Sequence, residues 1–163
     1  MTTGIQTVYL ETSAFNAPFA DDAPEQKNHA EQVLDGIRQG LYKPITSDYV
    51  IRELKATPDS DREKREAMLN LVDKYGISVY PIGAEAERLA DIYIREGVLT
   101  ERRRVDAMHI ALATVNGADV IVSYNFRHII KRRVVAMTRV INEREGYKGV
   151  EFLSHKGVNE NDG

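Results

Sequence analysis

Residues 102–128 have the sequence RRRVDAMHIALATVNGADVIVSYNFRH, and this stretch decides the fold. It predicts a helix that ends at Gly117, then a short and continuously apolar strand over 119–123, and then a polar segment. Asp106 lies near the start of the helix, and Asn125 follows the strand. Because ligands bind beyond the carboxyl ends of the strands in an open α/β sheet, we expect the chemistry of this protein at the polar segment.

Strands and helices alternate along the rest of the chain, which predicts an α/β fold with a parallel sheet covered by helices on both faces. We expect residues 1–154 to form a single domain and residues 155–163 to be a polar C-terminal tail. The expected strands cover 5–10, 43–46, 77–82, 119–123 and 150–153. The expected helices cover 25–39, a segment capped by Ser47, 57–74, 83–95, 100–116 and 134–145.

Composition places the chain among ordinary globular proteins, with 42% hydrophobic and 29% charged residues. No apolar run approaches the ~20 residues that cross a bilayer, and the amino terminus does not resemble a secretory signal. The chain has no cysteine, which excludes disulfides and thiolate metal sites and fits a reducing compartment. We therefore expect a cytoplasmic protein that does not contact membranes. Its net charge of −3 means that nucleic-acid binding would depend on local basic patches.

Polar side chains follow three of the predicted strands. Glu11 ends the first strand, Glu53 lies on the helix after the second, and Asp106 and Asn125 flank the apolar strand at 119–123. In a parallel sheet these groups converge at one edge, where a divalent cation such as Mg²⁺ relieves the repulsion between carboxylates. The alternative is that these acids, like most of the 25 in the chain, belong to solvated helix faces.

The helix at 102–116 favours the metal site. Its predicted core stripe consists of Val105, Met108, Leu112 and Val115. Asp106 and His109 are three residues apart, so they form a polar pair beside that stripe, which a surface helix does not need. For His109 itself, a hydrogen bond to a carboxylate or a backbone carbonyl is favoured slightly over a role as a metal ligand.

Two basic clusters border the predicted site. Arg102, Arg103 and Arg104 stand at the amino end of the helix, where positive charge is electrostatically unfavourable. Arg127 and His128, followed by three basic residues at 131–133, form the second cluster. These clusters modestly favour an RNA or DNA substrate, because their cations can bind phosphates. Each cluster taken singly is also typical of a solvated charged surface.

Five segments of the chain form a recognisable series: YLETSAFN at 9–16, VIREL at 50–54, RVDAMHIALA at 104–113, DVIVSYNFRHI at 119–129 and INEREGYKGVEFLS at 141–154. In this order they resemble the PIN-domain ribonucleases, particularly their VapC-like prokaryotic branch. The resemblance extends over residues 7–154. The order and spacing of several separated motifs make it more specific than any one short pattern.

The resemblance implies a three-layer α/β/α fold with a parallel sheet of about five strands, and cleavage of RNA with Mg²⁺ or Mn²⁺. It also implies a toxin that a small antitoxin neutralises, and a possible homodimer. By matching position, the catalytic residues and metal ligands are Glu11, Glu53, Asp106 and Asn125. The residues expected on the substrate side are Ser13, whose hydroxyl supports the site in many members, together with Arg104, Arg127 and His128.

Two positions depart from the family pattern. The first acid is nearly always Asp in the family but is Glu11 here, and its extra methylene moves the carboxylate by about one C–C bond, ~1.5 Å. The fourth position is often Asp but is Asn125, which offers a carbonyl oxygen without charge. A site with three carboxylates suits one metal ion better than a pair of metal ions.

These departures leave one other function open, a catalytically weakened PIN domain that binds RNA or a protein. In such a domain a Glu11→Asp change would create or raise nuclease activity. A separate alternative, a nucleotide-binding Rossmann domain, is disfavoured because no Gly-rich phosphate loop follows the first strand.

Overall fold

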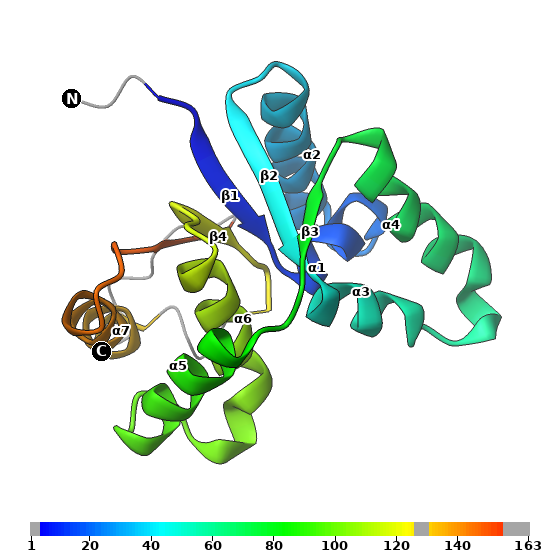
Figure 1. The fold of residues 1–163 in the computed structure, drawn as a ribbon. Helices are drawn as coiled ribbons and strands as arrows, with labels where there is room; N and C mark the ends of the chain where they lie inside the picture. Colours follow the sequence, from blue (N-terminus) through cyan, green and yellow to red (C-terminus); the bar gives the residue numbers. More distant parts are fainter. Residues whose placement is uncertain (1–3, 126–130, 155–163) are drawn as a thin grey trace.

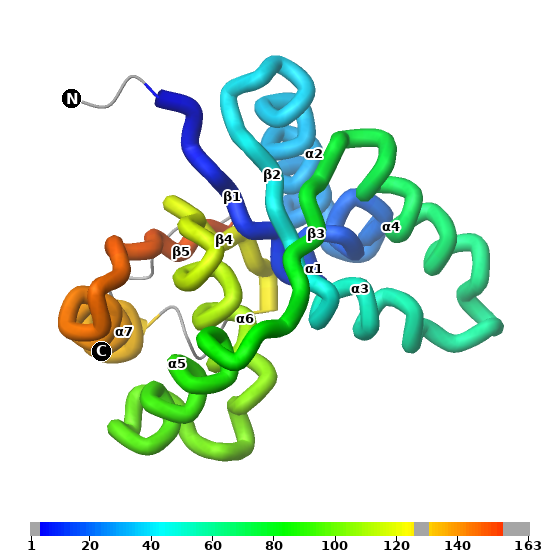
Figure 2. The backbone as a smooth tube through the Cα atoms, viewed as in Figure 1, coloured from blue at the N-terminus to red at the C-terminus, as the bar shows by residue number. Residues whose placement is uncertain are grey.

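Five parallel strands form one central sheet in the computed structural model, which describes residues 4–125 and 131–154 (Figures 1 and 2). The strands are β1 (Gln6–Leu10), β2 (Tyr42–Ser47), β3 (Ser78–Tyr80), β4 (Val120–Val122) and β5 (Glu151–Leu153), and their order is β3-β2-β1-β4-β5. Val8 on β1 lies beside Pro44 of β2 on one side and beside Val120 of β4 on the other. The strand order therefore reverses between β1 and β4, which is where open α/β sheets bind ligands.

Helices cover both faces of the sheet, as the alternating sequence pattern predicted. The helices are α1 (Thr12–Asn16), α2 (Pro24–Arg38), α3 (Asp48–Lys55), α4 (Arg62–Lys74), α5 (Ala84–Arg95), α6 (Arg104–Val115) and α7 (Arg132–Arg144). In Figure 1, α1, α2 and α4 lie on one side of the sheet, and α5, α6 and α7 lie on the other. The predicted three-layer α/β/α fold with a five-stranded parallel sheet is confirmed.

Two predicted helix starts were wrong, each by a few residues. The central helix begins at Arg104 instead of directly after Thr100, its predicted cap, because the 3₁₀ turn η3 (Glu101–Arg103) precedes it. The helix expected from Thr57 likewise begins at Arg62, after the 3₁₀ turn η2 (Asp59–Asp61). Short 3₁₀ turns are common at the amino ends of α-helices, and their residues carry the same capping signals.

The short helix α1 and the 3₁₀ turn η1 (Ala17–Phe19) were not predicted, because residues 16–24 carry strong loop signals. Glu11 is the N-cap of α1, and its side chain accepts a hydrogen bond from the backbone N–H of Ser13. A glutamate is an unusual N-cap, since aspartate, asparagine, serine and threonine are preferred there. The sequence therefore gave no ordinary capping signal for this turn.

The central helix α6 is buried on nearly all of its faces. Every residue from Ala107 to Thr114 is buried, because α6 packs against both β4 and α5. The predicted core stripe was wrong at Val105, which is 45% exposed, and Val115 is only half-buried. Gly117 ends the helix as predicted, with a φ of 76° that favours glycine.

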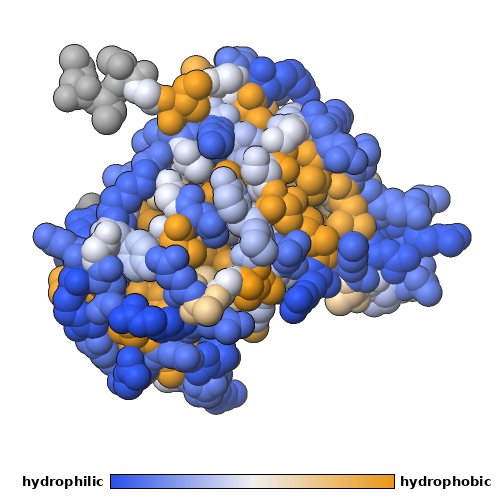
Figure 3. All heavy atoms as spheres, viewed as in Figure 1, coloured by the Kyte–Doolittle hydropathy of each residue, from blue (hydrophilic) through white to orange (hydrophobic). Residues whose placement is uncertain are grey.

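Polar and charged side chains cover much of the face shown in Figure 3, whereas apolar side chains are visible beside the edge strand β3. Val79 on that strand is 38% exposed. Among the described residues, no helix has both the length and the apolar character that crossing a membrane requires.

Candidate metal centre

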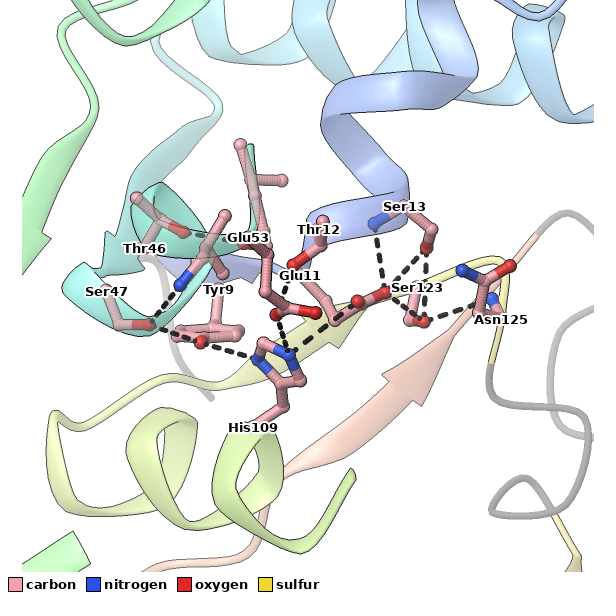
Figure 4. Close-up of polar contacts among 12 residues, drawn as sticks. Tyr9, Glu11, Thr12, Ser13, Thr46, Ser47, Glu53, His109, Ser123 and Asn125 are labelled. Carbon is pink, nitrogen blue, oxygen red and sulfur yellow. Dashed lines mark hydrogen bonds and ion pairs between the residues drawn. The ribbon is translucent and has the colours of Figure 1, made fainter. Parts of the chain in front are cut away.

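Acidic side chains converge with a histidine at the carboxyl edge of the sheet (Figure 4). Glu11 directly follows β1, Glu53 lies on α3 after β2, and His109 lies on α6. Each of these three side chains has one ligand atom within 4.8 Å of the other two. The cluster lies at the end of β1, where the strand order reverses.

The carboxylate of Glu11 is buried and held by three hydrogen bonds to one oxygen. Its Oε1 accepts from the Ser13 backbone N–H at 3.2 Å, from the Ser13 hydroxyl at 2.6 Å and from the Ser123 hydroxyl at 2.7 Å. Its other oxygen, Oε2, lies 3.8 Å from Nε2 of His109. The hydroxyls of Ser13 and Ser123, which we call the serine clamp, therefore orient Glu11 with Oε2 toward the cluster.

Glu53 and His109 form the second part of the centre. Oε1 of Glu53 accepts a hydrogen bond from the Thr12 hydroxyl at 2.7 Å and lies 2.8 Å from Nε2 of His109. Burial acts to raise the pKa of Glu53, but the hydrogen bond and charge of His109 and the Thr12 hydroxyl outweigh it and lower the pKa. Glu53 is therefore ionised at neutral pH. The expected hydrogen bond between His109 and a carboxylate is confirmed.

A chain of hydroxyls fixes the ring of His109, which is completely buried. The Tyr9 hydroxyl lies 3.0 Å from Nδ1 of His109 and 2.8 Å from the Ser47 hydroxyl oxygen, which caps α3 through the Val50 N–H. Burial raises the pKa of Tyr9 well above its ordinary value, so its proton stays in place. Because the ionised Glu53 carboxylate can only accept, Nε2 of His109 carries the proton of that hydrogen bond. The Tyr9 hydroxyl can donate to Nδ1 or accept from Nδ1–H without moving.

A Tyr9→Phe change is expected to lower the free energy of unfolding by ~1–3 kcal/mol. In a chain of this length each ~1 kcal/mol lowers the melting temperature by about 2–4 °C. The physical reason is that the change removes one hydroxyl that joins two buried polar groups. Thermal unfolding measured by circular dichroism tests this. The matched control is Tyr75→Phe, because the hydrogen bond that the Tyr75 hydroxyl accepts from Arg38 is exposed and its loss is expected to cost little. Equal melting temperatures for the two variants would contradict the structural role of Tyr9.

Asp106 lies one helical turn before His109 and is less buried, with 21% of its side chain exposed. Burial raises its pKa, and the charges of Glu11 and Glu53 act in the same direction, whereas His109 and Arg103 act against them. Arg103 lies 3.9 Å away. Asp106 is thus within electrostatic range of the cluster, although it is not one of the three residues within 4.8 Å.

The donor set fits a divalent cation. Ionised carboxylates with few compensating cations repel one another when partly buried, and a bound cation removes that cost. Hard cations such as Mg²⁺ and Mn²⁺ take carboxylate oxygens, and imidazole nitrogen is acceptable to Mn²⁺ and later transition metals more than to Mg²⁺. Glu11 and Glu53 offer such oxygens, with Asp106 beside them.

The remaining predicted site residues have varied surroundings. Asn125 is exposed, and its backbone N–H donates to the Ser123 hydroxyl. Ser13 is buried, and its hydroxyl donates to Glu11, so it supports that carboxylate. Arg104 forms ion pairs with Glu101 and Asp91, both at 2.6 Å. Arg127 and His128 lie outside the described residues.

Four supporting side chains were not identified from the sequence: Tyr9, Thr12, Ser47 as a partner of Tyr9, and Ser123. Thr12, Ser47 and Ser123 lie at or just after the carboxyl end of a strand, and Tyr9 is the second-last residue of β1. The position of these hydroxyls is a weak signal, because hydroxyls near strand ends are common. The sequence does not show which group each hydroxyl contacts, since that depends on the three-dimensional fold.

The PIN domain family model matches residues 8–134 of this chain. No curated protein matches the sequence. Among solved structures, a chain in the crystal structure of VapBC2 from Rickettsia felis bound to a DNA fragment from their promoter is similar in fold, with a TM-score of 0.55 at 12% sequence identity. The alignment covers 90% of this chain and 98% of that one.

Proposed function

Since the chain belongs to the PIN domain family, we propose that it is a metal-dependent endoribonuclease that hydrolyses phosphodiester bonds of RNA, in the manner of a VapC-like toxin. The observation that carries this proposal is the convergence of Glu11 and Glu53, with Asp106 beside them, at the carboxyl edge where the strand order reverses. Open α/β sheets bind ligands at that place.

In this proposal Glu11, Glu53 and Asp106 hold one Mg²⁺ or Mn²⁺ ion, and Asn125 completes the ligand shell or binds its water. The bound ion would supply an activated water and neutralise the charge that develops on the phosphate. The chain's own residues do the positioning. The serine clamp holds Glu11, while Thr12 and His109 hold Glu53, so the carboxylates need little reorganisation when a substrate binds.

Basic side chains would bind the RNA backbone. Arg104, Arg127 and His128 are the proposed phosphate contacts. Arg104 has to exchange its ion pairs with Glu101 and Asp91 for a phosphate, and both partners are exposed enough for water to replace the arginine. Arg103, which lies 3.9 Å from Asp106, is a further candidate beside the proposed ion.

The proposed partners follow from the same family. We propose a small antitoxin protein that neutralises the chain, a possible homodimer, and action in the cytoplasm. Growth arrest on expression, relieved by co-expression of a small neighbouring gene product, would support the toxin role. Normal growth would instead favour a housekeeping role in RNA processing.

A second candidate function is a PIN domain that binds RNA or a protein without cutting. Glu11 in place of the usual aspartate favours it, as does the uncharged Asn125. The two candidates differ in what Glu11→Asp does, a comparison taken up in the Discussion.

The first test is cleavage of structured and single-stranded RNA in the presence of Mg²⁺, Mn²⁺ or EDTA. We expect cleavage with either ion, none with EDTA, and a loss of at least about 100-fold in Asp106→Asn, because an amide cannot replace a ligand charge. Asp73→Asn, an exposed aspartate at the end of α4, is the matched control and should cleave normally. Equal rates for wild type and Asp106→Asn would mean a contaminating nuclease and would remove the main support for the proposal.

A further inference from the structure

A pocket of about 240 Å³ lies directly beside the candidate metal centre. It is lined by Tyr49, Arg52 and Glu53 of α3, by Ala56 directly after α3, and by Val105 of α6. Glu53 belongs to both the pocket and the acidic cluster, so a group in this pocket would be a neighbour of anything bound at the metal. The pocket is smaller than the ~300–1,000 Å³ typical of sites for drug-sized ligands, which suits a single flat ring system.

The walls of the pocket are mainly apolar and aromatic. Val105 is 45% exposed, although α6 is buried from Ala107 to Thr114, so core packing does not account for a valine here. Tyr49 is half-buried, and its ring meets the His109 ring edge-on, with centroids 5.2 Å apart and an interplanar angle of 85°. The fixed imidazole of His109 therefore braces one side of the Tyr49 ring.

Arg52 adds a positive charge at the rim of the pocket. It is exposed, and no ion pair joins it to another residue within 4–125 and 131–154. A cation at the rim favours an anionic backbone over the lysine or arginine side chains of a protein partner. Aromatic rings with nearby arginines are also the usual surfaces on which single-stranded nucleic acids stack their bases.

On the premise of the proposed function, we propose that this pocket binds one unpaired nucleobase of the RNA, next to the phosphate that is cleaved. Tyr49 stacks on the base, and Arg52 binds the adjoining backbone phosphate. The apolar side chains of Val105 and Ala56 contact the base and keep water away from it. A base inside a double helix cannot enter such a pocket, because its faces are already stacked. The pocket thus makes the site selective for single-stranded RNA.

The chain has no tryptophan, so a Tyr49→Trp variant carries a single tryptophan, which lies at the pocket. We expect a single-stranded RNA oligonucleotide to quench its fluorescence in EDTA, and expect neither a duplex of the same sequence nor pyrophosphate to do so. Tyr75→Trp, with its ring outside the pocket, is the matched control and should not respond. Equal quenching by duplex and single strand, or by pyrophosphate, would overturn the proposal in favour of simple phosphate binding.

Kinetics give a second measurement that a misfolded variant cannot imitate. Tyr49→Ala is expected to raise KM for single-stranded RNA by about ten-fold or more with a smaller change in kcat. Tyr49→Phe should keep the KM of the wild type, because stacking needs the ring and not the hydroxyl. If Tyr49→Phe is as impaired as Tyr49→Ala, the ring does not stack on a base and the proposal is wrong.

The failures of the two proposals are distinguishable. Metal-dependent cleavage without quenching of Trp at position 49 would overturn the base pocket and leave the ribonuclease intact. Quenching without any cleavage would support the base pocket and contradict the ribonuclease. Quenching by an added protein partner, with no response to RNA, would assign the pocket to that partner and overturn the base pocket.

Discussion

Replacement of Glu53 by glutamine is expected to reduce metal-dependent RNA cleavage by at least about 100-fold and to weaken Mn²⁺ binding in parallel. Glu53 is the residue on which the site depends most, because its Oε1 contacts both Thr12 and His109 and its carboxylate faces the proposed ion. Glutamine keeps the length of the side chain but loses the charge. Its carbonyl oxygen can still accept from Thr12 and His109 at the place of Oε1, but its NH₂ group then replaces Oε2 and cannot bind a cation.

Two assays separate the effects of this variant. Free Mn²⁺ measured by electron paramagnetic resonance reports binding without any need for activity, and RNA cleavage reports the chemistry. Glu143→Gln, an exposed glutamate on α7, is the matched control and should bind Mn²⁺ and cleave RNA as the wild type does. Unchanged Mn²⁺ binding with lost cleavage would show that Glu53 acts on the water or the RNA. Unchanged cleavage would place Glu53 outside the active site.

The pH dependence of stability gives a further check on Glu53. Its pKa is lowered in the folded protein, so its ionised form contributes stability above its ordinary pKa, and this contribution is lost as the pH falls through the folded value. The wild type should therefore lose its advantage in melting temperature over Glu53→Gln as the pH falls below about 4. A difference in melting temperature that is the same at pH 7 and pH 3 would contradict the pairing of Glu53 with His109 and Thr12.

Much of the fold could be predicted because its signals are local and repeated. The apolar strand after Gly117, the cap at Ser47 and the alternation of strands with helices each specify one element, and the structure agrees with them. The exposure of Val105 could not be predicted from such local signals. Its spacing fits the helical stripe of Met108 and Leu112, but the stripe assumes one buried face, and α6 is buried almost all round.

The approach of Glu11 and Glu53 to each other could be predicted, since side chains that follow parallel strands share one edge of the sheet. Their partners could not, because contacts such as Ser123 with Glu11 and Tyr9 with His109 join residues about a hundred positions apart. His109 illustrates the difference. Its spacing from Asp106 suggested a polar pair, but the structure brings it closest to Glu11 and Glu53, through the packing of α6 against the sheet.

A Glu11→Asp change is expected to weaken Mn²⁺ binding and RNA cleavage by about 10–100-fold, although it restores the residue usual in the family. The shorter side chain withdraws the carboxylate by ~1.5 Å, one C–C bond. Oε1 of Glu11 now accepts hydrogen bonds from the Ser13 N–H, the Ser13 hydroxyl and the Ser123 hydroxyl. An aspartate at this position cannot keep these bonds and also present its second oxygen at the place of Oε2.

The non-catalytic alternative makes the opposite prediction, namely a gain of activity in Glu11→Asp, so the sign of the change decides between the two functions. A double-mutant cycle with Ser123→Ala locates the cause. If the serine clamp positions Glu11, Ser123→Ala should weaken Mn²⁺ binding on its own, and the double variant should be little worse than Glu11→Asp alone, because both changes remove the same interaction. Fully additive losses would mean that Ser123 acts independently of Glu11. In that case the clamp would not explain how a glutamate serves where the family uses an aspartate.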